Sequence, residues 1–191
     1  MLPIIISAIE SPEDRDLMTD FYEMHNSAMY REARKHLDSP EDVEDIVLEA
    51  FAKIIDKMEI FRALKPLQRI RYALVTVRNL SYILLKRNNH FTFIPYDSLE
   101  FEIVANDDTN PEKCVEKKSI SLAIREIWAT LQPDDKILLE QKYVLHWTDS
   151  EIAGPLNIQP QSVRMKLTRA KRNLLNQLSA EEVNLLDWIP Q

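Results

Sequence analysis

The side chains best suited to recognition chemistry lie in one short stretch near the end of the sequence. There, amide, hydroxyl and cationic side chains follow Pro160 and recur on one side of an expected helix. Such side chains donate hydrogen bonds to base edges and pair with phosphates, which is how proteins read a DNA duplex. The residues expected to contact DNA are Gln161, Ser162, Arg164, Met165, Lys166, Arg169, Lys171 and Arg172. We expect early residues such as Arg164 to reach base edges and later cations such as Arg172 to reach phosphates.

Two short helices and a tight turn are needed to position this stretch. Thr148 and Glu151 form the capping-box pattern of a helix start, and Asn157 suits a left-handed turn residue before Pro160 opens the second helix. The expected buried stripe of the second helix consists of Val163, Leu167, Ala170 and Leu174. This layout predicts a helix-turn-helix whose second helix enters a DNA major groove. Pro155 lies inside the first helix, which allows a kink or an early end there.

The charge distribution decides whether an acidic chain can bind DNA. The 191 residues carry 24 Lys and Arg against 31 Asp and Glu, which gives a net charge of −7. Half of the cations lie in two windows without any Asp or Glu, residues 60–96 and 152–180, so the remainder of the chain carries −19. Nucleic acid responds to the local field within about a Debye length rather than to the total charge. Two such windows, each on an expected helix, favour phosphate-facing surfaces over merely solvated helix faces.

Composition and periodicity predict an all-α protein. A single Gly against 10 Pro is unusual for a sheet protein, which needs turn glycines, and the apolar spacing is helical. Ser11 and Ser39 each precede a proline and two acids, so the same helix-start signal is used twice. The first of these helices is expected to bury Leu17, Phe21, Met24 and Ala28, with Ala33 and Leu37. The second is expected to bury Val43, Ile46, Val47, Ala50, Phe51, Ile54, Ile55 and Met58, and a third, over 66–88, Ile70, Leu74, Val77, Leu80 and Leu84.

These elements predict two small helical domains joined by a linker. We place the first domain at 10–92, the linker at 93–118, the second, helix-turn-helix domain at 119–180 and a tail at 181–191. The linker is expected to set the spacing between the two DNA-contacting surfaces. The simplest role for Trp128, Trp147 and Trp188 is core packing or docking.

Several classes of function are disfavoured by the sequence. The lone Cys114 and the four scattered His residues give no metal-ligand spacing, and we find no nucleophile–base pair and no phosphate loop. We therefore expect no enzymatic activity, no cofactor and no metal. No apolar run approaches the roughly 20 residues that span a bilayer, and the first residues do not form a secretory signal. A cytoplasmic protein without membrane insertion is expected.

Taken together, the motifs resemble the small two-domain sigma factors of bacterial RNA polymerase, the extracytoplasmic-function group of the sigma-70 family. The resemblance covers about 20–87 and 131–178. Residues 38–51 are similar to the family's acidic helix that binds the polymerase, and residues 72–80 to the helix that reads the −10 promoter element. The order of Leu131-Gln-Pro, Tyr143, Glu151-Ile-Ala, Val163 and Arg169-Ala-Lys-Arg is similar to that of the −35-reading domain. Departures from the family pattern are Leu48, Tyr72, Ile83, Gly154-Pro155 and Asn157.

The resemblance implies two further sets of site residues. The polymerase-binding set is Asp42, Asp45, Leu48 and Glu49. The −10 set, which would hold melted single strand by aromatic stacking and cationic contacts, is Phe61, Arg69, Arg71, Tyr72, Arg78 and Asn79. Structural alternatives stay open for both sets. The acidic helix would then be a solvated helix start, Tyr72 a core residue, and Arg78 and Asn79 ordinary surface residues.

The function implied by the resemblance is that of a transcription initiation factor. Such a factor binds RNA polymerase core and directs it to promoters by recognising −10 and −35 elements. The expected partners are the polymerase core and promoter DNA, and the resemblance also allows an anti-sigma factor. Two other classes stay open: a helix-turn-helix transcriptional regulator that acts without direct polymerase binding, and a protein-interaction module whose acidic surface masks other factors.

Overall fold

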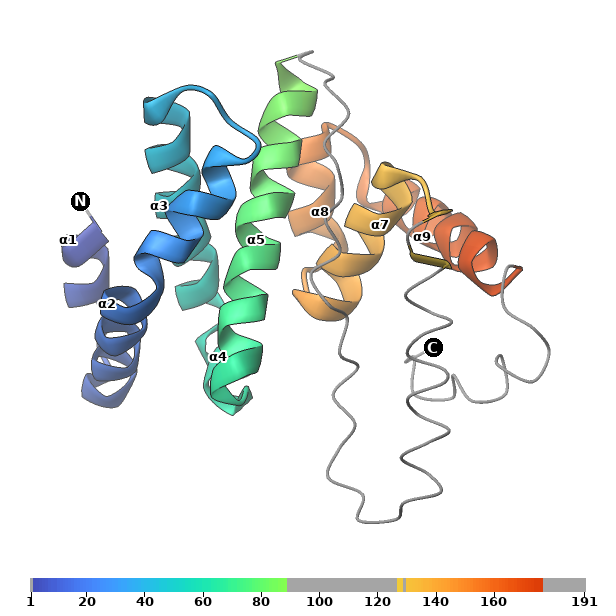
Figure 1. Ribbon diagram of the computed structural model, residues 1–191. Coiled ribbons are helices and arrows are strands. Elements are labelled where there is room, and N and C mark those ends of the chain that lie inside the picture. Colours follow the sequence, from blue (N-terminus) through green and yellow to red (C-terminus); the bar gives the residue numbers. More distant parts are fainter. Residues whose placement is uncertain (1, 89–126, 129, 177–191) are drawn as a thin grey trace, which may run out of the picture. The chain divides into compact units, whose positions relative to one another are not determined.

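The computed structural model describes residues 2–88, 127–128 and 130–176 of the chain (Figure 1). The chain divides into two compact units, Met1–Ile94 and Pro95–Gln191. Every regular element in the described residues is helical, which confirms the predicted all-α class. The predicted linker at 93–118 and tail at 181–191 lie outside the described residues, as does Trp188. Among the described helices, none is long and apolar enough to cross a membrane.

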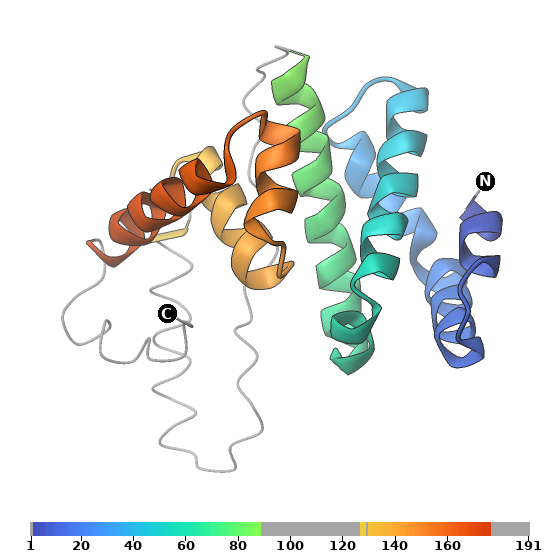
Figure 2. The same cartoon turned by 180° about the vertical axis from the view of Figure 1, so that it is seen from behind.

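The first unit is built from three long helices and two short ones. Its elements are α1 (Leu2–Ser7), α2 (Pro12–Arg34), α3 (Pro40–Asp56), α4 (Met58–Ala63) and α5 (Pro66–Arg87). Helices α2, α3 and α5 pack against one another, and both views show α3 and α5 running alongside each other (Figures 1 and 2). Short helix α1 precedes the predicted domain start at residue 10 and buries Ile6 against the rest of the unit.

The starts of α2 and α3 follow directly from the repeated serine–proline signal. The Ser11 hydroxyl accepts a hydrogen bond from the Asp14 backbone N–H at 3.3 Å, and the Ser39 hydroxyl accepts one from Asp42 at 3.3 Å. In both helices a proline occupies the first turn, where its missing N–H costs no intrahelical bond. The predicted caps are therefore confirmed, and each satisfies a backbone donor that the helix itself leaves unpaired.

The buried face of α3 was predicted correctly, whereas that of α2 was predicted only in part: Phe21, Ala33 and the following Leu37 are buried as expected. Along α3, the buried residues are Val43, Ile46, Val47, Ala50, Phe51 and Ile54, and Ile55 is half-buried. Met58, predicted for the same stripe, is half-buried and opens α4. Along α2, Met18, Phe21, Met29 and Ala33 are buried, while Met24 is 65% exposed. Apolar residues stand side by side at Leu17/Met18 and Ala28/Met29, so spacing alone does not decide which of each pair faces the core.

Aromatic rings hold the first unit together where α2, α4 and α5 meet. Phe61 of α4 is fully buried, and its ring centroid lies 5.0 Å from that of Phe21 and 6.0 Å from that of Tyr72. Phe21 in turn lies 6.4 Å from Phe51 of α3. All three pairs are edge-on, which is a favourable arrangement for aromatic rings. The short helix α4 is thus fixed to the three long ones.

The second unit positions its last helix against two earlier segments. Its described elements are α7 (Pro133–Leu139), a π-helical segment η1 (Glu140–Val144), α8 (Asp149–Leu156) and α9 (Pro160–Leu175). Helix α9 packs on both α7 and α8. One core cluster consists of Trp128, Leu131, Leu139, Ala170 and Leu174. Trp147 is also buried, so the predicted core role of Trp128 and Trp147 is confirmed.

A buried carboxylate near the end of α2 makes an interaction with neighbouring basic side chains whose strength depends on pH. Glu32 accepts from Lys35 Nζ at 2.8 Å and lies 3.4 Å from His36 Nε2. Burial on its own raises the pKa of Glu32, but hydrogen bonds from His36 and Lys35 outweigh it and lower the pKa from 4.5 to about 2. The ionised form is therefore the one that the fold stabilises.

Replacing Glu32 by Gln should destabilise the first unit in a pH-dependent way. Because the folded-state pKa is depressed, the stabilisation is fully present above about pH 4.5 and is lost as the pH falls toward 2. Near neutral pH we expect Glu32→Gln to lower the free energy of unfolding by about 1–2 kcal/mol. Urea unfolding followed by circular dichroism across this pH range measures the difference, with the exposed Glu13→Gln as the matched control. A wild-type-to-variant difference that stays constant with pH would contradict the assignment.

Candidate nucleic-acid interface

Helices α8 and α9 are joined by a short connection whose geometry matches the sequence signals. Thr148 Oγ1 accepts from the Glu151 N–H at 3.2 Å, and Glu151 Oε2 accepts from the Thr148 N–H at 2.7 Å, so the capping box is confirmed. Asn157 adopts the left-handed conformation, with φ 51° and ψ 45°. Helix α8 runs through Pro155 and ends at the next residue, so the proline lies in its last turn. Pro160 then opens α9.

The two faces of α9 differ sharply in burial. The stripe Val163, Leu167, Ala170 and Leu174 is buried, as predicted. The eight residues predicted to contact DNA are all accessible to solvent: Gln161, Arg164, Met165, Arg169 and Arg172 are exposed, and Ser162, Lys166 and Lys171 are half-buried. Met165 is 69% exposed although it is apolar. The described part of the second unit therefore presents a cationic face, containing one apolar side chain, on the outer side of α9.

Two cations of this face, Arg164 and Lys171, contact other parts of the second unit. Arg164 Nε donates to Asp149 Oδ2 at 2.8 Å, and Lys142 Nζ donates to Asp149 Oδ1 at 2.7 Å. The Lys171 ammonium lies 4.9 Å from the ring centroid of Tyr143, a cation–π contact. The hydrogen bonds from Arg164 and Lys142 lower the pKa of Asp149, so this carboxylate stays ionised below the usual range for Asp. Sequence reasoning did not identify Asp149, because its partner Arg164 is fifteen residues away.

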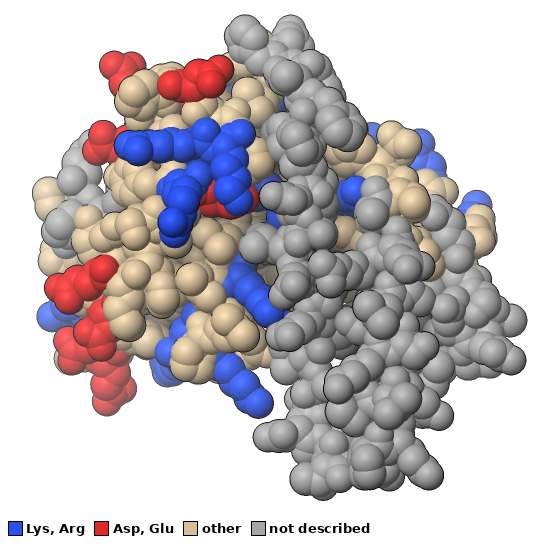
Figure 3. Space-filling model, viewed as in Figure 1, with Lys and Arg blue, Asp and Glu red and all other residues tan. Residues whose placement is uncertain are grey.

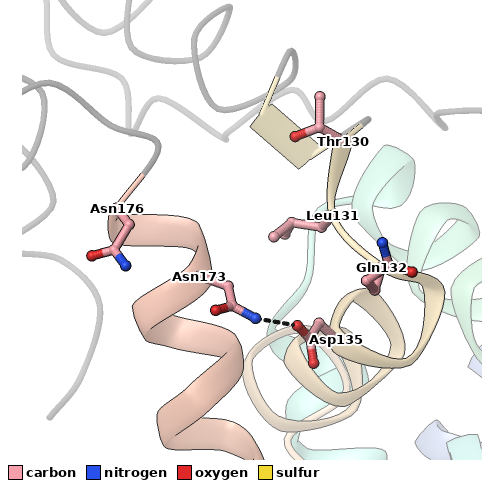
Figure 4. Close-up of a pocket in the computed structure, with 6 residues that line it drawn as sticks. All are labelled: Thr130, Leu131, Gln132, Asp135, Asn173 and Asn176. Atoms are coloured by element: carbon pink, nitrogen blue, oxygen red, sulfur yellow. Dashed lines mark hydrogen bonds between the residues drawn. The ribbon is translucent and has the colours of Figure 1, made fainter.

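The far end of α9 is tied to the start of α7. Asn173 Nδ2 donates to Asp135 Oδ2 at 2.8 Å, and Asp135 is almost fully buried (Figure 4). The two side chains lie in the wall of a small pocket that is also lined by Thr130, Leu131, Gln132 and Asn176. We interpret this contact as structural, because it joins two helices of one core and fixes the axis along which the α9 cations are displayed.

The polymerase-binding residues predicted from the resemblance lie along the solvent side of α3. Asp45 and Glu49 are exposed, and Asp42 and Leu48 are half-buried, on the side opposite the buried stripe. In the view of Figure 3, the largest group of Lys and Arg side chains lies over the first unit with acidic atoms among it, and smaller basic and acidic groups lie elsewhere on this face.

The structure corrects the prediction that Phe61 and Tyr72 stack on unpaired bases. Phe61 is 0% exposed and Tyr72 is 3% exposed, and their rings pack on each other within the aromatic core of the first unit. Arg78 and Asn79 are also buried, and Asn79 Nδ2 donates to the Val75 carbonyl at 2.9 Å. The alternative interpretation of Tyr72 as a core residue is therefore correct, whereas Arg78 and Asn79 are not the surface residues that this alternative assumed.

Arg69 joins α5 to the end of α4. Its Nε donates to the Phe61 carbonyl at 3.1 Å and its Nη2 donates to the Arg62 carbonyl at 2.8 Å. The guanidinium also lies 5.9 Å from the centroid of the Phe61 ring. These carbonyls belong to the last turn of α4, where the helix leaves acceptors unpaired. Arg69 therefore holds the turn between α4 and α5, whereas Arg71 is a half-buried cation further along α5.

Removing the Arg69 side chain should loosen the turn between α4 and α5. In Arg69→Ala the two carbonyls lose a charged donor, which should cost the last turn of α4 about 1–2 kcal/mol locally. The Leu64 amide, which donates to the Phe61 carbonyl at 3.3 Å, should then exchange its hydrogen roughly tenfold faster. Arg87→Ala, an exposed site on the same helix, should leave this exchange rate unchanged. Equal rates in Arg69→Ala and the wild type would show that Arg69 does not hold the turn.

Comparison with known protein families identifies the first unit. Residues 21–91 match the family Sigma-70 region 2, a stretch that begins within α2 and includes α3, α4 and α5. A comparison with curated proteins found no match. Sigma factors are non-catalytic proteins of transcription that work with RNA polymerase core and promoter DNA. The first unit thus contains a sigma-70 region 2, which supports a sigma factor of the sigma-70 family with a role in transcription initiation.

Proposed function

We propose that the chain is an extracytoplasmic-function type sigma factor that recognises both a −10 and a −35 promoter element. The observation that carries the proposal is the presence, in one chain, of a sigma-70 region 2 and of a second unit whose α9 exposes cations opposite a buried stripe. The region 2 of the first unit would engage the polymerase and the melted −10 element. The second would act as a helix-turn-helix that reads the −35 duplex in the major groove.

The polymerase contact is proposed for the outer side of α3. Asp45 and Glu49 stand one helical turn apart and are exposed, with Asp42 and Leu48 beside them. Two carboxylates on a rigid helix favour a basic surface on the partner, and Leu48 would supply an apolar contact next to them. Because the α3 core stripe is fully buried, the axis and rotation of this helix are fixed before binding.

The −10 contact is proposed for the cationic turn between α4 and α5 and for Arg71. Phe61 and Tyr72 take part only by supporting this region, since both rings are buried. A direct DNA contact by Arg78 or Asn79 requires that these side chains become accessible when the factor binds the polymerase. Arg69 would shape the turn rather than contact bases, because its guanidinium is already engaged by two carbonyls.

The main competing function is that of a helix-turn-helix regulator that acts on DNA without polymerase. Helix α9 by itself suits both functions, since an exposed cationic face on a second helix is common to many DNA-binding proteins. The match of residues 21–91 to region 2 favours the sigma factor, because a regulator of this kind needs no such domain. Binding to purified polymerase core separates the two functions.

Reversing charge on α3 should weaken binding to polymerase core. We expect Asp45→Lys and Glu49→Lys each to lower the affinity for core at least tenfold, because each replaces a complementary contact by a repulsive one. Glu44→Lys is the matched control, since Glu44 is exposed on the same helix but lies outside the proposed contact set. Fluorescence anisotropy of the labelled full chain with core measures the affinities. Equal losses in all three variants would indicate a general charge effect and contradict the proposed surface.

Two arginines on α9 should differ in what their removal does to DNA binding. With core polymerase and a promoter duplex selected from a random library, Arg172→Ala should weaken all duplexes similarly and reduce the salt slope by about 1. Arg164→Ala should in addition relax sequence choice, by about 1–3 kcal/mol at the affected base pair. Titrations at several salt concentrations with selected and random duplex provide the comparison. Identical effects of both variants on both duplexes would refute this division of roles.

A further inference from the structure

The contact between α8 and α9 places an arginine in an unusual setting for an exposed residue. Arg164 is 81% exposed along its side chain, yet its Nε is bound to Asp149 Oδ2 at 2.8 Å. Among the described residues, this is the hydrogen bond that the Arg164 guanidinium donates. The end of the guanidinium formed by Nη1 and Nη2 donates no such hydrogen bond within the described residues, so it stays available to a ligand.

Asp149 is itself held firmly enough to orient a partner. It is the first residue of α8, directly after the Thr148 cap, and its side chain is only 17% exposed. Its second oxygen accepts from Lys142 Nζ at 2.7 Å, so both oxygens are engaged. A carboxylate fixed in this way restricts the rotamers of Arg164 before any ligand binds, which lowers the entropy that binding must remove.

The free end of this guanidinium has a specific match among the four bases. Two parallel N–H donors fit the N7 and O6 acceptors that guanine presents in the major groove. Adenine offers one acceptor beside a donor at the same edge, and cytosine presents a donor. Arg164 also stands in the second turn of α9, where side chains of a recognition helix reach base edges.

We propose that Asp149 is a positioning residue that presents the outer edge of Arg164 to a guanine of the promoter duplex. The proposal rests on the −35 reading by α9 proposed above and adds the base that is read and the residue that prepares the reader. A simple surface ion pair would instead contribute little and would not affect base choice. A carboxylate that merely repels DNA would, when neutralised, raise affinity for every duplex alike.

The test uses the full chain with polymerase core and a duplex selected from a random library. Each guanine in the −35 region of that duplex is replaced in turn by 7-deazaguanine, which lacks the N7 acceptor. For the wild type, one guanine should show a loss of affinity of about fivefold or more. In Arg164→Ala this guanine should show no loss on deaza substitution.

In Asp149→Asn, 7-deazaguanine at the same position should reduce the affinity by less than about half of the wild-type fold loss. In Asp149→Glu, part of the wild-type fold loss should return. The salt slope should be unchanged, because the number of phosphate contacts is the same. Glu44→Gln, a charge-matched neutralisation in the first unit, should leave the deaza effect intact. Circular dichroism melting of the Asp149 variants shows whether the second unit remains folded, and Asp149→Glu keeps the test valid if Asp149→Asn does not.

Two outcomes overturn the inference. If the wild type prefers its selected duplex but Asp149→Asn keeps the full deaza effect, or raises affinity uniformly, the positioning role is wrong while −35 reading stands. If the wild type with core does not distinguish selected from random duplex, the proposed −35 function fails, and the inference fails with it.

Discussion

The burial of one stripe of α9 determines which of its side chains can meet a ligand. Val163, Leu167, Ala170 and Leu174 fix the helix against α7 and α8, and rotation about its axis would expose them to water. The left-handed Asn157 sets the start of the helix, and the Asn173–Asp135 contact sets its end. Because both ends and one face of α9 are fixed, its cations can lie only on the solvent side. They are therefore exposed there without any ordering induced by a ligand.

An acidic total charge and a DNA-binding role are compatible because cations are concentrated on one face of α9. Salt largely screens the interaction between exposed charges that lie further apart than a Debye length, about 8 Å at physiological ionic strength, so a bound polyanion responds mainly to the charges nearest to it. The acids of α3 and the cations of α9 belong to different units of the chain. Acidic regions elsewhere can therefore disfavour non-specific binding while the local field of α9 still attracts phosphates, which would sharpen the choice of promoter.

The features that the sequence predicted are those that depend on neighbours in the chain. The Ser11 and Ser39 caps, the Thr148–Glu151 capping box and the Asn157 turn are interactions between residues a few positions apart, and each was predicted and found. The buried stripes of α3 and α9 were also predicted, because their apolar residues recur at the helical period.

The features that the sequence did not predict depend on residues far apart in the chain. The burial of Phe61 arises from packing against Phe21 and Tyr72 on two other helices. The positions of Arg69 and Asp149 depend on partners eight and fifteen residues away across a turn. In an amphipathic pattern an arginine or an aspartate indicates only a polar position. Its partner and its role can be identified only from the folded structure. The π-helical η1 left no recognisable signal in the sequence either.

Promoter-directed transcription with purified polymerase core decides whether the protein is a sigma factor that recognises an upstream duplex element. A promoter selected from a random library by the factor together with core serves as the template for run-off synthesis. We expect one transcript with a defined start, which is lost when the upstream duplex element is scrambled and when core is supplied without the factor. Unchanged start sites of core in the presence of the protein, or a transcript that survives scrambling of that element, would show that the protein does not select promoters in this way.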